Sequence, residues 1–255
     1  METETENGTV ELNVDNGVGT IEFFHPKSNS LPGEILKGIA DTITDAGSND
    51  DIRIIILKSK GEKAFCAGAS FDELVSIENF EDGKEFFMFA RVINAARKCP
   101  KFILGRIQGK AVGGGVGMAA ATDYCLATEN ASIKLSELAL GIGPFVVGPA
   151  VERKIGKTCF TSMTMNPTSW YSAQWAFDNG LFTEVHPNIS SLDDAVCEMY
   201  EKLVKFSPQA MKEMKKVFWE GTENWDELLE ERAALSGELV LSDYTKKTIE
   251  KIKQG

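Results

Sequence analysis

The sequence predicts an α/β fold in which short strands, small-residue loops and helices alternate along the chain. This strand–loop–helix pattern occurs at residues 52–74, recurs at 102–121 and returns in shorter form at 124–140. The run Ile52-Arg-Ile-Ile-Ile-Leu57 is apolar enough to form a strand that is buried on both faces. Beyond residue 192 the pattern is essentially all helical. Repeated units of this kind place their loops on the same side of the structure.

Local patterns predict the elements in order. Residues 10–24 alternate apolar and polar side chains around Asn16-Gly17, a preferred turn pair, and so predict a β-hairpin. Apolar spacing predicts a helix from Pro32 to about Gly47. We also expect a helix over 82–96, a strand over 102–112, and helices over 145–155, 158–165 and 169–179. Helices over 193–206, 207–219, 225–241 and 243–253 follow. The composition changes near 187–191, so we expect an α/β core over 1–190 and a helical region over 191–255.

Composition narrows the class of protein. The 255 residues carry a formal net charge of −11, which argues against nucleic acid or an anionic membrane as a partner. The acidic N-terminus lacks an apolar signal segment, and we expect a cytoplasmic protein. Five scattered cysteines indicate reduced core thiols, and two histidines argue against a His-based metal site. We expect neither a metal nor a cofactor.

The rest of the chain is organised around the stretch from Lys110 to Asp123, which contains three successive glycines. Backbone without Cβ atoms at a strand-to-helix junction lets a ligand approach the free N–H groups of the first helical turn. Such a place suits negative charge that develops on an oxygen atom. The phosphate-binding and dinucleotide-binding glycine patterns are both absent here. A tight junction with purely structural packing is the alternative.

Glu137 is the main candidate for acid–base chemistry. It lies among apolar residues, which leaves three interpretations. Its carboxyl group is desolvated and has a raised pKa, or it is paired with a cation such as Lys134. Alternatively, Glu137 is a helix-starting residue in a capping role beside Ser136. We expect Asp72 and Glu73 to complement a helix dipole.

Other polar residues are expected to be structural. Asp123 should make a structural hydrogen bond. The lysines at 212, 215, 216, 246 and 247 form a mostly solvated helix face, of which one or two could meet phosphate. The context of Ser70 and of the two histidines argues against a Ser–His–Asp hydrolase.

Several short motifs follow one another along nearly the full length of the chain. They are Lys63-Ala-Phe-Cys-Ala-Gly-Ala69, Gly109-Lys-Ala-Val-Gly-Gly-Gly115 with Asp123, Ser136-Glu-Leu-Ala-Leu-Gly141, Gly180-Leu181 and Ser207-Pro208. In this order and at these spacings they resemble the crotonase superfamily, the enoyl-CoA hydratases and isomerases. The resemblance implies a spiral of ββα units, and a C-terminal helical region that builds homotrimers, often paired into hexamers. It also implies an acyl-CoA substrate.

The resemblance assigns roles to individual positions. The thioester oxygen would lie between the N–H groups of Ala69 and Gly114, and Glu137 would be the catalytic acid/base. Substrate and CoA would contact the segments that contain Lys27 and Ser28, Lys63, Ala67 to Ala69, Gly113 and Gly114, Gly117, and Pro144 with Phe145.

One departure from the hydratase pattern bears on the reaction. Hydratases carry a second glutamate at the position that Gly117 occupies here. A single carboxylate can move a proton from C2 to C4, and monofunctional enoyl-CoA isomerases resemble this chain in keeping only the glutamate at position 137. The chain is therefore expected to be an enzyme that favours double-bond isomerisation.

Three alternatives stay open. A hydratase of 2-enoyl-CoA, or of a branched substrate such as methylglutaconyl-CoA, could recruit Asp72 or Glu73 as a second acid. Decarboxylation of a carboxyacyl-CoA would use the same oxyanion site. An RNA-binding or non-catalytic member of the fold is disfavoured by the charge and by the lack of a basic stripe.

Overall fold

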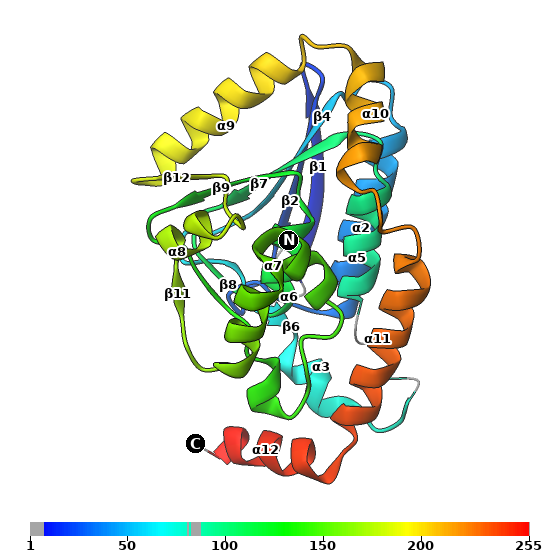
Figure 1. The fold of residues 1–255 in the computed structure, drawn as a ribbon, viewed down its shortest axis with the longest axis vertical. Coiled ribbons are helices and arrows are strands. Elements are labelled where there is room, and N and C mark those ends of the chain that lie inside the picture. Colours follow the sequence, from blue (N-terminus) through cyan, green and yellow to red (C-terminus); the bar gives the residue numbers. More distant parts are fainter. Residues whose placement is uncertain (1–7, 81, 83–87, 255) are drawn as a thin grey trace.

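A six-stranded sheet is the largest sheet in the computed structural model, which describes residues 8–80, 82 and 88–254 (Figure 1). Its strands run in the order β1-β2-β4-β7-β9-β12. Only the β1–β2 pair is antiparallel within this sheet, and it forms the hairpin expected around Asn16-Gly17. The strands are β1 (Thr9–Asp15), β2 (Val18–Phe24), β4 (Ile54–Ser59), β7 (Phe102–Ile107), β9 (Tyr124–Thr128) and β12 (Glu184–His186).

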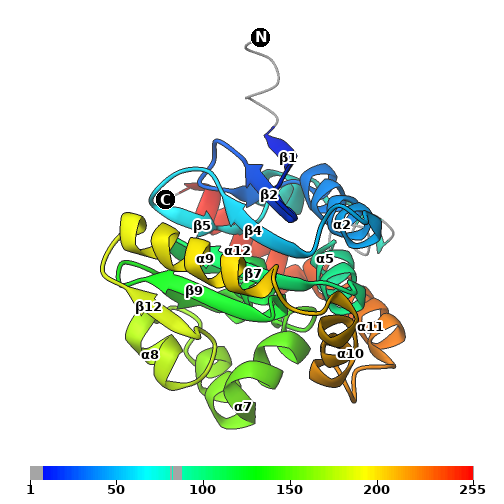
Figure 2. The ribbon, with the colours of Figure 1, turned by 90° about the horizontal axis from the view of Figure 1, so that it is seen from above.

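Both faces of this sheet are covered, as the apolar run at 52–57 predicts. Ile55 and Leu57 of β4 belong to the main apolar cluster, which also contains residues of α2 (Gly33–Ser48) and α5 (Phe89–Lys98). Ile54 and Ile56 face a second cluster that includes Leu192 of α9 (Ile189–Leu203). Figures 1 and 2 accordingly place α9 on one side of the sheet and the α2–α5 pair on another.

Short strands beside the large sheet build the surroundings of the glycine turn. After β4 the chain continues into β5, after β7 into β8, and after β9 into β10, so each turn contributes a strand to both sheets. This is the expected spiral of ββα units. The second sheet runs β11-β10-β8-β5, and β3 pairs with β6. These strands are β3 (Ser30–Leu31), β5 (Ala64–Cys66), β6 (Gly68–Ala69), β8 (Lys110–Val112), β10 (Ser132–Lys134) and β11 (Tyr171–Ser172).

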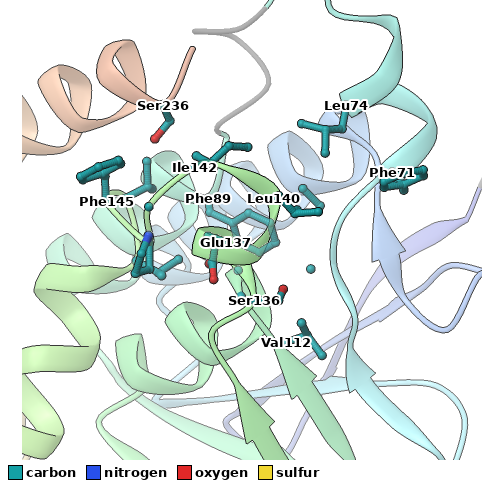
Figure 3. A pocket seen from close by; sticks show the side chains of 18 of the residues that line it. Phe71, Leu74, Phe89, Val112, Ser136, Glu137, Leu140, Ile142, Phe145 and Ser236 are labelled. Carbon is teal, nitrogen blue, oxygen red and sulfur yellow. The ribbon is translucent and has the colours of Figure 1, made fainter. Parts of the chain in front are cut away.

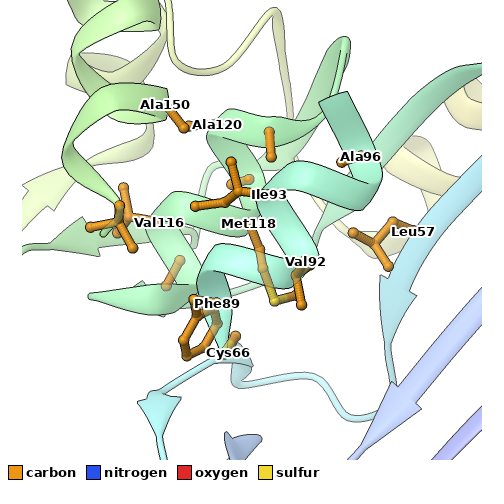
Figure 4. Packing of buried hydrophobic residues seen from close by; sticks show 14 of the residues in the cluster. Leu57, Cys66, Phe89, Val92, Ile93, Ala96, Val116, Met118, Ala120 and Ala150 are labelled. Atoms are coloured by element: carbon orange, nitrogen blue, oxygen red, sulfur yellow. The ribbon is translucent and has the colours of Figure 1, made fainter. Parts of the chain in front are cut away.

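The helix that follows the glycines lies in the centre of the molecule. All residues of α6 (Gly114–Ala121) are buried, which explains why it consists of small and apolar residues. It packs against α5, β8 and α7 (Gly148–Met165). Figure 4 shows this packing, with Phe89, Val92 and Ile93 of α5 around Met118 of α6.

The C-terminal helical region consists of α9, α10 (Pro208–Phe218), α11 (Trp225–Val240) and α12 (Asp243–Gln254). α11 packs on α5, and α12 packs on α11 and on the 3-10 helix η1 (Glu137–Leu140). The helices expected over 193–206, 207–219, 225–241 and 243–253 are therefore present with small shifts. The boundary at 190/191 between two domains stays a prediction.

Four expectations need correction or restriction. The strand expected over 102–112 is two strands, β7 and β8, which belong to different sheets. The helix expected over 169–179 begins only at Ala173 as α8 (Ala173–Asp178), because residues 171–172 pair with β10. The two helices expected between 145 and 165 form α7, which begins at Gly148 and has a kink at Gly156. In the helix expected over 82–96, residues 83–87 lie outside the described residues.

The cysteines at 66, 99, 125, 159 and 197 are free thiols, as expected, but Cys159 and Cys197 are half-buried and do not lie in the core. Cys66, Cys99 and Cys125 are buried, and burial raises the pKa of Cys66 and of Cys125 to about 12. Within the described ranges, no helix combines the length and apolar composition that crossing a bilayer requires.

Candidate active site

The glycine turn joins β8 to the N-terminus of α6. Gly113 has φ 52° and ψ −112°, a conformation that requires glycine, and its N–H donates to the carbonyl of Lys134 at 2.9 Å. Gly114 is the first residue of α6, where N–H groups have no partner within the helix. The positive end of the helix dipole lies at the same place. The sequence prediction of a strand-to-helix junction at these glycines is confirmed.

The loop that contains Ala67, Gly68 and Ala69 lies directly beside this turn. Gly68 has φ 96°, and a Cβ atom added to it would be 3.1 Å from the carbonyl oxygen of Val112 and 3.9 Å from the nitrogen of Gly114. β6 is held by its pairing with β3, and the Ser30 hydroxyl donates to the carbonyl of Ala69 at 3.0 Å. Two segments separated by more than forty residues thus bring Ala69 and Gly114 to the wall of one pocket.

The carboxyl group of Glu137 lies over this turn. A Cβ atom added to Gly113 would be 2.9 Å from Glu137 Oε1, so only glycine leaves room for the carboxyl group. Ser136 makes no capping hydrogen bond to η1, which argues against the capping interpretation of this segment. No described cation pairs with Glu137, which argues against the ion-pair interpretation as well.

Glu137 as a residue is half-buried, but Oε2 of its carboxyl group is enclosed. Oε2 is buried and has no hydrogen-bond partner in the described part of the chain. Burial raises the pKa of Glu137 from 4.5 to about 7, and a hydrogen bond from its own backbone N–H lowers it by less. A buried charged form costs free energy when neither a cation nor hydrogen bonds compensate it, and this cost is the cause of the raised pKa. Of the interpretations of Glu137, the structure supports the desolvated carboxyl group.

The pocket around Glu137 has a volume of about 240 Å³ and is mostly apolar. Within the described residues, Glu137 is the only ionisable side chain that lines it. Figure 3 shows Glu137 and Ser136 between Val112 below and Ile142 above, with Phe145 and Phe71 at opposite ends. The apolar lining consists mainly of Phe71, Leu74, Phe89, Val112, Leu140, Ile142, Pro144, Phe145, Val146 and Val147.

Most of the residues expected to bind substrate line this pocket, but some do not. Ala67, Gly68, Ala69, Gly113, Gly114, Pro144 and Phe145 all line it. Gly117 does not: it is buried within α6, where an added Cβ atom would be 2.5 Å from Val147 Cγ1. The side chain of Val147 therefore occupies the space that a larger residue at 117 would need.

Three residues expected to contact CoA lie on the surface outside the pocket. Lys27, Ser28 and Lys63 are exposed, and Lys27 forms an ion pair with Asp72. The Lys27–Ser28 loop is held by Asn29, which sequence reasoning missed. The Asn29 amide donates to the carbonyls of Lys60 and Ala64 at 3.0 and 3.1 Å.

The two acids considered as substitutes for a second glutamate have other contacts. Glu73 Oε2 accepts a hydrogen bond from the Gly33 N–H at 2.8 Å, and its own N–H is capped by Ser70 at the start of α3 (Phe71–Ser76). The ion pair with Lys27 lowers the pKa of Asp72. Neither side chain lines the pocket.

Asp123 makes structural hydrogen bonds, as expected, and it also forms an ion pair with Lys215 that was not expected. It accepts hydrogen bonds from the Ile103 N–H at 2.8 Å and from Trp219 Nε1 at 3.0 Å. Lys215 forms a buried ion pair with it at 2.5 Å. The prediction of a solvated face is therefore wrong for Lys215, since its helix packs over the end of β7.

The pocket also contains a residue that no local pattern could indicate. Ser236 of α11 is buried and lines the pocket, about a hundred residues after Glu137 in the chain. Its hydroxyl donates to the carbonyl of Arg232 at 2.9 Å, which leaves its oxygen lone pairs available to a ligand.

Comparisons with known proteins agree with this geometry. The trans-2-decenoyl-[acyl-carrier-protein] isomerase of Streptococcus mutans is 25% identical over 223 residues, which cover 84% of this chain and 83% of that protein. The short-chain-enoyl-CoA hydratase of Clostridium acetobutylicum is 27% identical over 209 residues, which cover 81% and 79%. The chain spans about half the length, 50% and 54%, of two further relatives from Bacillus subtilis.

The fold has close counterparts among solved structures. The crystal structure of an enoyl-CoA hydratase from Bacillus halodurans matches with a TM-score of 0.88 and 22% identity, and covers 95% of this chain and 99% of that one. A sequence model of the family described as Enoyl-CoA hydratase/isomerase matches residues 13–253. The chain therefore belongs to the enoyl-CoA hydratase/isomerase family of the crotonase superfamily.

Proposed function

We propose that this protein moves a carbon–carbon double bond in an enoyl-CoA, with Glu137 as the single acid/base. The N–H groups of Ala69 and Gly114 would hold the thioester oxygen. The adjacency of the two backbone segments and the position of Glu137 over Gly113 support this assignment. The reaction moves a proton and needs no metal or cofactor.

The proposed reaction takes place in two proton transfers. The Glu137 carboxylate removes a proton from C2 of a 3-enoyl thioester, and the electron pair of that C–H bond delocalises onto the thioester oxygen. Two N–H donors stabilise this oxyanion, each typically worth ~10²–10³ in rate. The protonated Glu137 then returns the proton to C4, and the double bond comes to lie between C2 and C3. A pKa of about 7 suits both steps, because the same group must accept and donate near neutral pH.

One observation favours isomerisation over hydration. Hydration needs a water molecule to be activated while a proton is delivered, which two carboxylates share. Position 117 is a glycine packed against Val147, and the pocket offers Glu137 alone among its described lining residues as an ionisable group. Asp72 and Glu73 have partners outside the pocket. A mostly apolar pocket with a single carboxylate suits proton transfer between carbons better than water addition.

The remaining parts of the proposal concern the CoA moiety and the assembly. Exposed Lys27 and Lys63 provide positive charge near the pocket-forming loop, where the CoA phosphates would compete with Asp72 for Lys27. A homotrimer or homohexamer is the proposed assembly.

The test compares 3-enoyl-CoA and 2-enoyl-CoA substrates in deuterated water. We expect conversion of the 3-enoyl substrate to the 2-enoyl isomer, with the C2 proton carried to C4, little deuterium at that carbon and no addition of water. Glu137→Gln should reduce this rate by ~10²–10⁴-fold, because it removes the general acid–base group. Glu129→Gln, an exposed glutamate between β9 and β10, is the matched control. Water addition to the 2-enoyl substrate at a rate equal to or above isomerisation would instead identify a hydratase.

A further inference from the structure

A second cavity lies behind the segment that closes the candidate active site. It has a volume of about 720 Å³ and shares Gly143, Pro144 and Phe145 with the first pocket. The remaining walls come from Leu138 of η1, from α7, from the turn before α11 and from α11 itself. The 143–145 segment is thus a thin partition between the two spaces.

Phe145 is the side chain that controls this partition. Figure 3 shows it at the end of the first pocket that lies away from Phe71. Its ring rests on Gly143, where an added Cβ atom would be 2.6 Å from Phe145 Cε2. Phe145 is half-buried. Because it lines both spaces, a turn of its ring would change the passage between them.

The lining of the second cavity changes from apolar to basic. Phe145, Phe160, Trp225 and Leu228 provide apolar surface. Three cations, Arg153, Lys157 and Arg232, line the same space together with two carboxylates, Glu152 and Glu220.

None of these five charged side chains takes part in an ion pair with another described residue. An excess of positive charge that faces a cavity is unusual in a chain whose net charge is −11.

Of the three cations, Arg153 is the one whose side chain stacks on an aromatic ring. Its guanidinium lies 4.3 Å from the centre of the Trp219 ring. Arg153 is exposed as a residue, and the partial desolvation of its guanidinium lowers its pKa, although Asp123 opposes this effect. Asp123 itself is already bound by Lys215 and by Trp219. The positive charge of Arg153 therefore has no carboxylate of its own, and its guanidinium geometry suits a carboxylate ligand.

We propose that the second cavity receives the far end of the acyl chain, and that this end carries a carboxylate. The preferred substrate class is therefore an enoyl-CoA with a terminal carboxylate on its acyl chain. The thioester and the double bond occupy the pocket of Glu137, the middle of the chain passes Phe145, and the terminal carboxylate meets Arg153, Lys157 and Arg232. This inference rests on the proposed function in so far as an acyl thioester must occupy the first pocket.

Binding of unreactive ligands tests the inference without requiring turnover. Saturated acyl-CoA thioesters of increasing length are compared by calorimetry, in pairs of equal carbon number that end in a methyl group or in a carboxylate. We expect equal binding of short pairs, whose ends stay in the first pocket. For pairs long enough to pass Phe145, the carboxylate-ended thioester should bind roughly tenfold more tightly, as charge-assisted hydrogen bonds in a partly exposed site allow.

A double variant locates the effect. Lys157→Gln with Arg232→Gln should markedly reduce the preference for the carboxylate end, with Arg153 as the remaining cation, and leave binding of short thioesters unchanged. Lys212→Gln is the matched control, because Lys212 is an exposed lysine of α10 that does not line the cavity. Melting temperatures close to that of the wild type would show that the variants fold.

The outcomes separate this inference from the proposed function. If long methyl-ended thioesters bind as tightly as carboxylate-ended ones, or if the double variant keeps the preference, the inference is wrong even where isomerase activity is present. If the preference follows the cations but 3-enoyl-CoA is not isomerised, the substrate class stands and the proposed reaction is wrong. If no acyl-CoA binds, both are wrong.

Discussion

Replacing Glu137 by glutamine should make the folded chain more stable at high pH. The carboxyl group is buried without a partner for Oε2, and its pKa rises from 4.5 to about 7 on folding. That difference of roughly 2.5 pH units corresponds to about 3 kcal/mol, at ~1.4 kcal/mol for each pH unit. Glutamine has nearly the same shape and never ionises, so the variant escapes this cost.

The sign follows from proton linkage. Below pH 4.5 the carboxyl group is protonated in both the unfolded and the folded chain, and it adds no penalty. Between pH 4.5 and about 7 only the unfolded chain ionises, so the wild type loses stability relative to the variant as the pH rises. Above about pH 7 both states are ionised and the difference stays constant.

Denaturant unfolding at several pH values measures this difference. The unfolding free energy of Glu137→Gln minus that of the wild type should rise by about 3 kcal/mol between pH 4 and pH 8. Any cost of the glutamine amide itself is the same at every pH and cancels from this rise. Glu129→Gln, on the exposed turn, serves as the control and should give a flat difference. A flat difference for Glu137→Gln as well would refute the claim that this carboxyl group is desolvated.

Three further predictions concern the pocket and its support. Lys215→Met should lower the unfolding free energy by ~3–5 kcal/mol, because it leaves the Asp123 carboxylate buried without its cation. Denaturant unfolding would measure this loss, and an unchanged unfolding midpoint would contradict the prediction. Gly117→Glu should lower the unfolding free energy by ~1–3 kcal/mol and give no hydratase activity, because Val147 fills the space beside position 117. Combining this substitution with Val147→Ala should recover stability in the same unfolding assay. Isomerase activity should fall as the pH drops through about 7, since a protonated Glu137 cannot accept a proton; a pH–rate midpoint near 4.5 would count against this role.

Local features of the site could be predicted from the sequence because its chemistry depends on short motifs. The three glycines after an apolar strand indicate a strand-to-helix junction. An isolated glutamate in an apolar segment makes a desolvated carboxyl group one of three interpretations, and the structure is needed to choose among them. Both features need only a few neighbouring residues to be recognised. The alternation of strands and helices likewise predicts the α/β class and the C-terminal helices.

Contacts between distant segments could not be predicted in this way. Val147 fills the space beside Gly117, and no local pattern relates the two positions. Lys215 has the periodicity of a surface lysine, and only the packing of α10 over β7 buries it beside Asp123. Strand β11 is two residues long, so its apolar content is too small to distinguish it from the start of α8. Each failure arises where tertiary packing overrides a local propensity.

The acidity of Glu137 is a property of the whole chain rather than of its own segment. An apolar cluster beside the pocket combines Leu74 of α3, Ile142 after η1, Val240 of α11 and Ile249 of α12. These residues come from four separate parts of the sequence, and Leu74 and Ile142 also line the pocket. α12 also contacts η1 directly, with Thr245 against Gly141. The C-terminal helices therefore pack against the segments that bury the Glu137 carboxyl group, and this burial raises its pKa to about 7, where a single carboxyl group can both take and return a proton.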